Sequence, residues 1–181
     1  MIDSGYSYYK IGVKKINRDG HLNEHKYKFK NRKGHVYIIQ VDEYLHDIFF
    51  VKFYLGIHKT HPNKYKYLTK TNDAFRVIRT SINTLLELKD KNSNASFGFM
   101  GSPSVNKKGD GKEESLINTQ RFRIYEYVTN NYFGNLSFTH SLDKNYSCYL
   151  LINNCNPDVK EYIARITEMF KSIYPSLDAL N

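Results

Sequence analysis

The sequence has no tryptophan, few cysteines and no long apolar segment. Its 181 residues include only two cysteines, four prolines and three methionines. Cys148 and Cys155 lie seven positions apart and lack the close spacing of a zinc site. No run of about 18 apolar residues exists, which excludes a membrane-spanning helix. The first residues lack the basic and apolar regions of a secretory signal, so we expect a cytoplasmic protein without a disulfide, a metal or a membrane partner.

Acidic residues are also in short supply. The chain has 27 Lys and Arg against 18 Asp and Glu, a net charge of +9. Residues 1–70 carry 14 basic and 6 acidic side chains, whereas residues 71–181 carry 13 and 12. Residues 10–33 alone hold nine basic and two acidic side chains. A positive field of this kind favours an anionic partner, either nucleic acid or an acidic protein, bound through residues 10–33.

Aromatic residues are abundant, with 16 Tyr and 11 Phe. An AT-rich genome would explain this excess, and so would a surface on which tyrosines stack against a partner. Residues 26–30 read Lys-Tyr-Lys-Phe-Lys, and residues 64–67 read Lys-Tyr-Lys-Tyr. This period of two predicts strands with one aromatic face and one lysine face.

The lysine–aromatic pattern has two interpretations. Exposed lysines could neutralise phosphates while exposed aromatic rings stack on bases. Alternatively, the rings pack inward and the lysines protect a strand edge from aggregation. No recognised nucleic-acid motif accompanies the pattern. Under the first interpretation, the residues that bind nucleic acid are Lys26, Lys28, Lys30, Arg32 and Lys33.

The hydrophobic pattern predicts a single α/β (α+β) domain over residues 1–181, with a mixed, mostly antiparallel sheet flanked by helices. We expect an antiparallel meander whose strands cover residues 5–13, 25–31, 35–42, 47–56 and 64–70, with residues 14–24 as a loop. The elements expected after it are helix 73–89, strand 95–100, a long loop at 101–114, helix 116–132, and a hairpin of strands 135–141 and 146–153. The last helix is expected to begin with Asn156 as its cap and Pro157 in its first turn.

Other constellations carry weaker signals. His21 and His25 are four apart, and His58 and His61 are three apart, but both pairs fall in expected loops without neighbouring ligands. A metal site is therefore not predicted. The phosphate-binding and serine-nucleophile motifs G-x-x-x-x-G-K-[ST] and G-x-S-x-G are missing. A general base could come from Glu113, Glu114 or Glu126, and nothing in the sequence selects one of them.

Three short segments, together with the order of elements, carry a resemblance to a known family. They read Phe-Arg-Val-Ile-Arg-Thr at 75–80, Phe-Gly-Phe at 97–99 and Thr-Gln-Arg-Phe-Arg-Ile-Tyr at 119–125. A meander followed by β-α-β-α-β-β resembles the GNAT family of N-acyltransferases, in particular small uncharacterised members from phages and bacteria. The resemblance covers residues 35–153, which leaves a basic N-terminal extension at 1–34 and an extra C-terminal helix at 154–181.

The resemblance implies transfer of an acyl group from acetyl-CoA or another acyl-CoA to an amine. The CoA pyrophosphate would bind at the N-terminus of helix 73–89, beside Lys70, Thr71, Asn72 and Ala74. The family's loop is glycine-rich, whereas this one has no glycine and contains Asp73. Tyr125 matches the family's general acid, and it also fits a core position on an amphipathic helix.

Two hypotheses remain. The first is an N-acyltransferase with a degenerate CoA-binding loop. The second is a non-catalytic basic protein that binds nucleic acid or an acidic partner protein, so the sequence leaves open whether the chain is an enzyme. A phage origin, which would place the protein in the host cytoplasm, suits either hypothesis.

Overall fold

The computed structural model describes residues 5–67, 72–105 and 113–174. Within these ranges the chain forms seven strands, three α-helices and two short 3-10 turns, η1 and η2. In chain order they are β1 (Tyr8–Arg18), β2 (His21–Lys30), β3 (Val36–Tyr44), η1 (Leu45–Asp47), β4 (Ile48–Leu55), η2 (Gly56–His58), α1 (Ala74–Lys91), β5 (Ser96–Met100), α2 (Gln120–Tyr132), β6 (Phe138–Asp143), β7 (Cys148–Asn153) and α3 (Val159–Ile173).

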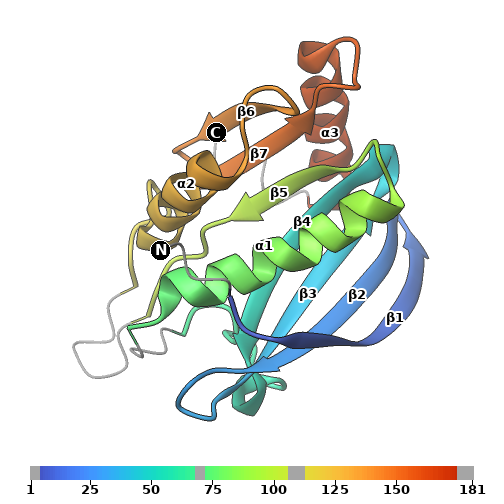
Figure 1. Ribbon diagram of the computed structural model, residues 1–181. Coiled ribbons are helices and arrows are strands. Elements are labelled where there is room, and N and C mark those ends of the chain that lie inside the picture. The colour runs from blue at the N-terminus through green and yellow to red at the C-terminus, as the bar shows by residue number, and fades with distance from the viewer. Residues whose placement is uncertain (1–4, 68–71, 106–112, 175–181) are drawn as a thin grey trace.

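The seven strands form one sheet in the order β1-β2-β3-β4-β5-β7-β6 (Figure 1). β4 and β5 run parallel, with Ile48–Val51 paired to Ser96–Phe99. Every other neighbouring pair is antiparallel. Parallel strands need a long crossover, and α1 supplies it between β4 and β5. The expected fold class is confirmed: a mixed, mostly antiparallel sheet with helices and a C-terminal helix.

The helices lie on both faces of the sheet. α1 and α2 cover one face, and α3 lies on the other (Figure 1). Successive side chains of a strand point to opposite faces. On β4, therefore, Phe49 and Val51 join the core beneath α1 and α2, while Ile48 and Phe50 pack with α3. α3 has 15 residues and is about 22 Å long, so it covers only part of its face.

The expected loop at residues 14–24 was wrong, because β1 and β2 form a hairpin. β1 continues to Arg18 and β2 begins at His21, and these two residues are paired. Asp19 and Gly20 both have positive φ angles, 50° and 82°. That conformation matches the twist of the flanking strands, and Asp-Gly is one of the dipeptides that favour it. The Asp-Gly dipeptide could therefore have predicted this hairpin from the sequence, despite the polar residues around it.

The strand expected at residues 64–70 was also wrong over its described part. Residues 62–66 form turns, in which the Lys64 N–H donates to the His61 carbonyl at 3.1 Å and the Lys66 N–H donates to the Asn63 carbonyl at 2.9 Å. Tyr67 pairs with Val105 in an isolated bridge outside the named strands. Residues 68–71 lie outside the described ranges. The hydrogen-bonded turns that follow Pro62 thus replace the strand that the alternation of lysine and tyrosine predicted.

Two helices begin later than expected. α2 starts at Gln120 rather than near residue 116, because the Thr119 hydroxyl accepts a hydrogen bond from the Phe122 N–H at 3.2 Å. α3 is capped by Asp158, whose carboxylate accepts from the Glu161 N–H at 2.9 Å. The cap predicted at Asn156 is therefore wrong: Asn156 belongs to the turn after β7 and bonds to the Asn153 carbonyl. In the three described ranges, no helix is long and apolar enough to cross a membrane.

Candidate functional site

The predicted CoA-phosphate site lies at the N-terminus of α1. Asn72 and Ala74 are described there, whereas Lys70 and Thr71 lie outside the described residues. The Asp73 carboxylate accepts hydrogen bonds from the Tyr6 hydroxyl at 3.0 Å and from the Asn31 side-chain amide at 2.9 Å. A carboxylate of the chain itself thus lies at the helix end, where the helix dipole favours negative charge. The arrangement stabilises α1 and places an acidic group where a pyrophosphate would bind.

The predicted general acid, Tyr125, lies in the core between the sheet and α2. Its ring centroid is 5.3 Å from that of Phe99. Burial raises the pKa of Tyr125 to about 12, although the nearby Arg121 lowers it in part. A neutral, buried phenol can donate a proton only to a partner that reaches the core. Phe99 and Tyr125 both belong to the cluster beneath α1 and α2.

The five predicted nucleic-acid-binding residues lie on β2 and in the turn after it. Lys26, Lys28 and Lys30 alternate along β2 and share one sheet face, the side on which α3 lies. Arg32 and Lys33 are exposed at the tip of the turn. The Asn31 side chain organises this turn, because its carbonyl oxygen accepts from the N–H groups of residues 33 and 35. Asn31 also donates to Asp73, so the basic turn lies beside the N-terminus of α1.

The cross-strand register extends the β2 lysines into a wider basic surface. One row of neighbouring residues runs Gly12, Lys26, Gln40, Lys52 across β1 to β4, and a second runs Lys14, Glu24, Asp42, Phe50. A third row runs Tyr9, Lys28, Ile38, Tyr54, and Lys64 lies 4.5 Å from the centroid of the Tyr54 ring. We call this surface the lysine face; its cations are Lys14, Lys26, Lys28, Lys30, Lys52 and Lys64.

Acidic partners neutralise two lysines of the lysine face. Lys26 lies 2.7 Å from Glu24, and Lys52 lies 2.5 Å from Asp42. Within the described ranges, Lys14, Lys28, Lys30 and Lys64 have no acidic side chain within salt-bridge distance. Burial and the neighbouring lysines 26 and 52 lower the pKa of Lys64. The surface therefore keeps a surplus of positive charge.

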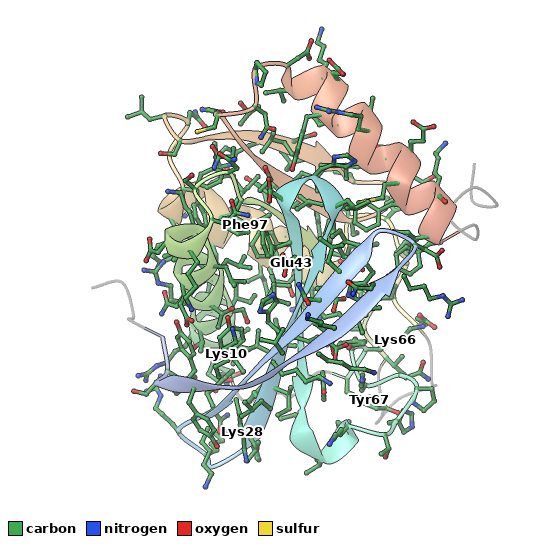
Figure 2. The ribbon with its side chains drawn as sticks, turned by 90° about the vertical axis from the view of Figure 1, so that its right-hand side faces the viewer. Lys10, Lys28, Glu43, Lys66, Tyr67 and Phe97 are labelled. Carbon is green, nitrogen blue, oxygen red and sulfur yellow. The ribbon has the colours of Figure 1, made fainter. Side chains whose placement is uncertain are left out.

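The aromatic residues of the lysine–aromatic segments lie mostly inside the protein. Tyr27 and Phe29 are fully buried beneath α1, on the face opposite the lysines. Tyr9 is exposed on the lysine face, and Tyr65 packs its ring edge-on against Tyr54. Figure 2 looks onto the β1–β2 ribbon and labels Lys28 on it. Phosphate contact is thus available at the lysines that have no described acidic partner, whereas base stacking is available at few positions.

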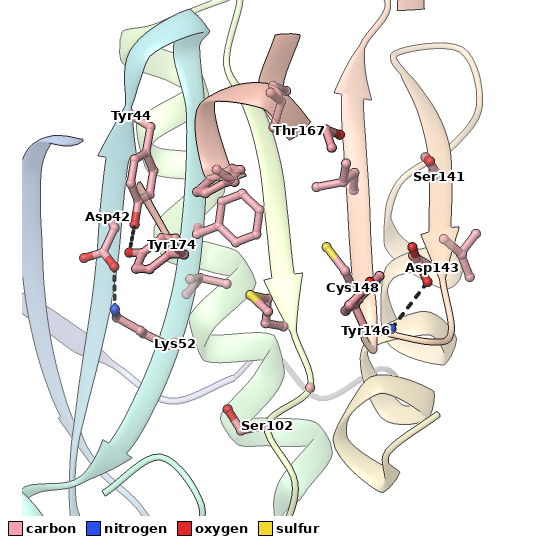
Figure 3. Close-up of a pocket in the computed structure, with 18 of the residues that line it drawn as sticks. Asp42, Tyr44, Lys52, Ser102, Ser141, Asp143, Tyr146, Cys148, Thr167 and Tyr174 are labelled. Atoms are coloured by element: carbon pink, nitrogen blue, oxygen red, sulfur yellow. Dashed lines mark hydrogen bonds and ion pairs between the residues drawn. The ribbon is translucent and has the colours of Figure 1, made fainter. Parts of the chain in front are cut away.

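A cavity of about 710 Å³ lies on the same side of the sheet, beneath α3. Its walls come from β3 to β7, the loop after β5, the turn at residue 65 and the inner face of α3. Figure 3 shows Asp42, Tyr44 and Lys52 on one side and Ser141, Asp143 and Cys148 on the other, with Thr167 and Tyr174 contributed by the α3 region. Sequence reasoning missed this site. The available signal was a pair of polar residues, Gln40 and Asp42, in an otherwise apolar strand. They are two positions apart and therefore point to the same face of the sheet.

A hydrogen-bonded polar group forms one end of the cavity. Asp42 is 2 % exposed, and its carboxylate binds Lys52 at 2.5 Å and accepts from the Gln40 amide at 2.8 Å. The Tyr65 hydroxyl donates to the side-chain amide oxygen of Gln40 at 3.1 Å. The hydroxyls of Tyr44 and Tyr174 lie 2.9 Å apart. Burial is the main reason that the pKa values of Tyr44 and Tyr65 lie well above the ordinary value.

The other titratable candidates are used in structural contacts. His25 lies 2.8 Å from Glu43. The carboxylate of Glu114 accepts from the N–H groups of residues 104 and 120, and Glu113 pairs with Lys66. In the parts of the chain that the structure describes, no three His, Cys, Asp or Glu residues cluster as metal ligands would. Both thiols are free, Cys148 half-buried and Cys155 exposed.

Comparison of the chain with protein-family models, with curated proteins and with solved structures finds no match.

Proposed function

We propose that this protein binds nucleic acid without catalysis, through the lysine face. The observation that supports this proposal best is the strand register, which gathers six lysines on one face of β1 to β4 and its adjoining turn. Only Glu24 and Asp42 carry negative charge in the same rows. Adjacent lysines on one side of a strand are about 7 Å apart, so the row on β2 presents a line of separate cations to a polyanion.

The composition of the lysine face sets the expected mode of binding. Lysine is a point charge that contacts phosphate, and phosphate contacts position a protein without reading sequence. With Tyr27 and Phe29 buried, few rings are available to stack on bases. We therefore expect weak sequence preference and strong dependence on salt, because binding releases counterions from the nucleic acid.

The test compares two triple variants by fluorescence anisotropy with a labelled duplex and a labelled single strand. Lys14, Lys28 and Lys30 are changed to Gln, since these side chains make no described ion pair whose loss would destabilise the fold. The control changes the exposed Lys59, Lys144 and Lys160 to Gln, which alters the net charge equally. Each lost phosphate contact lowers the slope of log K against log salt by about 0.9 for a duplex.

We expect the first variant to reduce the salt slope by about 2 to 3 and the control to leave it nearly unchanged. Equal losses for both variants would mean that only the overall charge matters, and the proposal would fail. Binding that is indifferent to salt would also contradict it.

Acyl transfer is the second candidate, and the order of elements favours it. The sheet has β-α-β-α-β-β after the meander, and the parallel pairing of β4 and β5 stops at Val51 and Phe99 although β4 continues to Leu55. Differential scanning fluorimetry with millimolar CoA and acetyl-CoA tests this candidate, because a ligand that binds only the folded state raises Tm. An increase with both ligands supports it, and an unchanged Tm at millimolar concentration rejects it.

A further inference from the structure

We propose that the cavity beneath α3 binds a small organic anion with an apolar body. Its volume, about 710 Å³, falls within the range of ligand pockets. The apolar body would lie under α3, and the anionic head would lie at the Lys52 end. The site shares Lys52 and Lys64 with the lysine face, and its apolar part under α3 is distinct from the lysines of β1 and β2.

The walls of the cavity leave apolar surface uncovered by any described residue. Met100, Leu142 and Tyr174 line it and are 43 %, 40 % and 40 % exposed. Phe50 and Phe170 stand edge to face in its wall, with ring centroids 4.8 Å apart. A cluster of exposed apolar side chains around a concave site is typical of a binding site rather than of bare surface.

The charges at the mouth determine which head group fits. The Asp42 carboxylate is buried and already accepts from Lys52 and Gln40, so it is poorly placed to receive a ligand cation. Lys52 is the more exposed partner of the pair, at 36 % of its side chain. Lys64 lies 5.1 Å from the centroid of the Tyr65 ring, which itself lines the cavity. Lys171 also lines the cavity, and so does a second carboxylate, Asp143, which accepts from the N–H groups of residues 145 and 146. Both carboxylates are thus engaged within the protein, and the ammonium groups in and beside the lining outnumber them.

The state of Lys64 supports an anionic ligand. Burial and repulsion from the lysines at 26 and 52 lower its pKa. A carboxylate or phosphate placed between these cations would relieve that repulsion, as opposite charges favour the charged form. A ligand cation would increase it.

Isothermal titration calorimetry of the full chain with octanoate, octan-1-ol and octylammonium tests both parts of the proposal. The three probes share an apolar body and differ in charge. We expect octanoate to bind at least tenfold more tightly than either of the others, which corresponds to about 1.4 kcal/mol. Equal affinity for octanoate and octylammonium, or no binding of octanoate at millimolar concentration, would overturn the proposal.

Variants then locate the site. Leu142→Trp and Met100→Trp place a bulky ring at the mouth from half-exposed positions, so the fold should tolerate them, and each should weaken octanoate binding at least tenfold. Leu136→Trp is the matched control, since Leu136 is 97 % exposed and does not line the cavity. Unchanged affinity in both mouth variants would place the octanoate elsewhere and reject the site. The natural chain has no tryptophan, so the new indole also reports whether each variant is folded.

Discussion

The Nζ atom of Lys52 on β4 lies 2.5 Å from a carboxylate oxygen of Asp42 on β3. The two residues are not direct cross-strand partners, because Lys52 is opposite Gln40 and Asp42 is opposite Phe50. Their contact is therefore diagonal, and Gln40 completes it by donating to the other carboxylate oxygen at 2.8 Å. This network holds a buried carboxylate at the end of the cavity, on the same sheet face as the other lysines.

Removing one partner of this ion pair should destabilise the fold more than removing both. Lys52→Met leaves the buried Asp42 carboxylate with only the Gln40 amide at 2.8 Å and the His21 ring at 3.7 Å, and we expect a loss of about 2 to 3 kcal/mol in the free energy of unfolding. The value lies at the low end for a buried pair because Lys52 is partly exposed. Urea denaturation of Lys52→Met, Asp42→Asn and the double variant measures the coupling. If the double variant loses the sum of the two single losses, the residues do not interact.

Gly98 leaves the space that the Phe50 ring occupies. The two residues are paired across β5 and β4, and a Cβ atom on Gly98 would overlap the Phe50 ring. Gly98→Ala should therefore lower the free energy of unfolding by about 1 to 3 kcal/mol through overpacking. Combining it with Phe50→Leu should recover part of the loss. Gly12→Ala on β1 is the control, because nothing lies within 4 Å of its added Cβ. Loss of equal size at both glycines would show that overlap with the Phe50 ring is not responsible.

The Tyr27 hydroxyl is buried and has no hydrogen-bond partner among the described residues. Tyr27→Phe removes that unsatisfied group, and we expect an increase of about 1 kcal/mol in the free energy of unfolding. Tyr162→Phe is the counterpart, because the Tyr162 hydroxyl donates to the His46 carbonyl at 2.5 Å. That variant should lose about 1 kcal/mol. Chemical denaturation measures both changes. The prediction requires that the free energy of unfolding rise for Tyr27→Phe and fall for Tyr162→Phe.

Alkaline pH should unfold the protein through its buried tyrosines. The pKa is raised, chiefly by burial, for Tyr8, Tyr27, Tyr44, Tyr54, Tyr65, Tyr125, Tyr149 and Tyr162. In the unfolded chain these phenols ionise near pH 10, so above about pH 10 the unfolded state loses protons first and becomes favoured.

The free energy of unfolding should therefore be insensitive to these groups below pH 10 and should fall above it. Circular dichroism and tyrosinate absorbance, recorded in one titration, check this. The absorbance of the buried set should appear together with the loss of structure. Ionisation of all 16 tyrosines near pH 10 in a protein that stays folded would contradict it.

The sequence by itself determined the type of most elements and the two faces of β2. The period of two in residues 26–30 required that Tyr27 and Phe29 share one face and the lysines the other, and the structure has this arrangement. The apolar spacing from residue 74 onward predicted α1. These features depend on neighbours within a few positions of the chain, where the geometry of a strand or a helix leaves little choice.

Only the tertiary structure decided which residues of different strands come together. The lysine face needs a register between four strands, and the cavity brings Tyr44 within hydrogen-bonding distance of Tyr174, 130 positions later. A shift of one residue in any strand would send its lysines to the opposite face. Register is fixed by turns and by packing between distant segments, and no local pattern in the sequence encodes it. Lys52 could thus be recognised from the sequence as a lysine in an apolar strand, but its position opposite Gln40 and beside Asp42 could not.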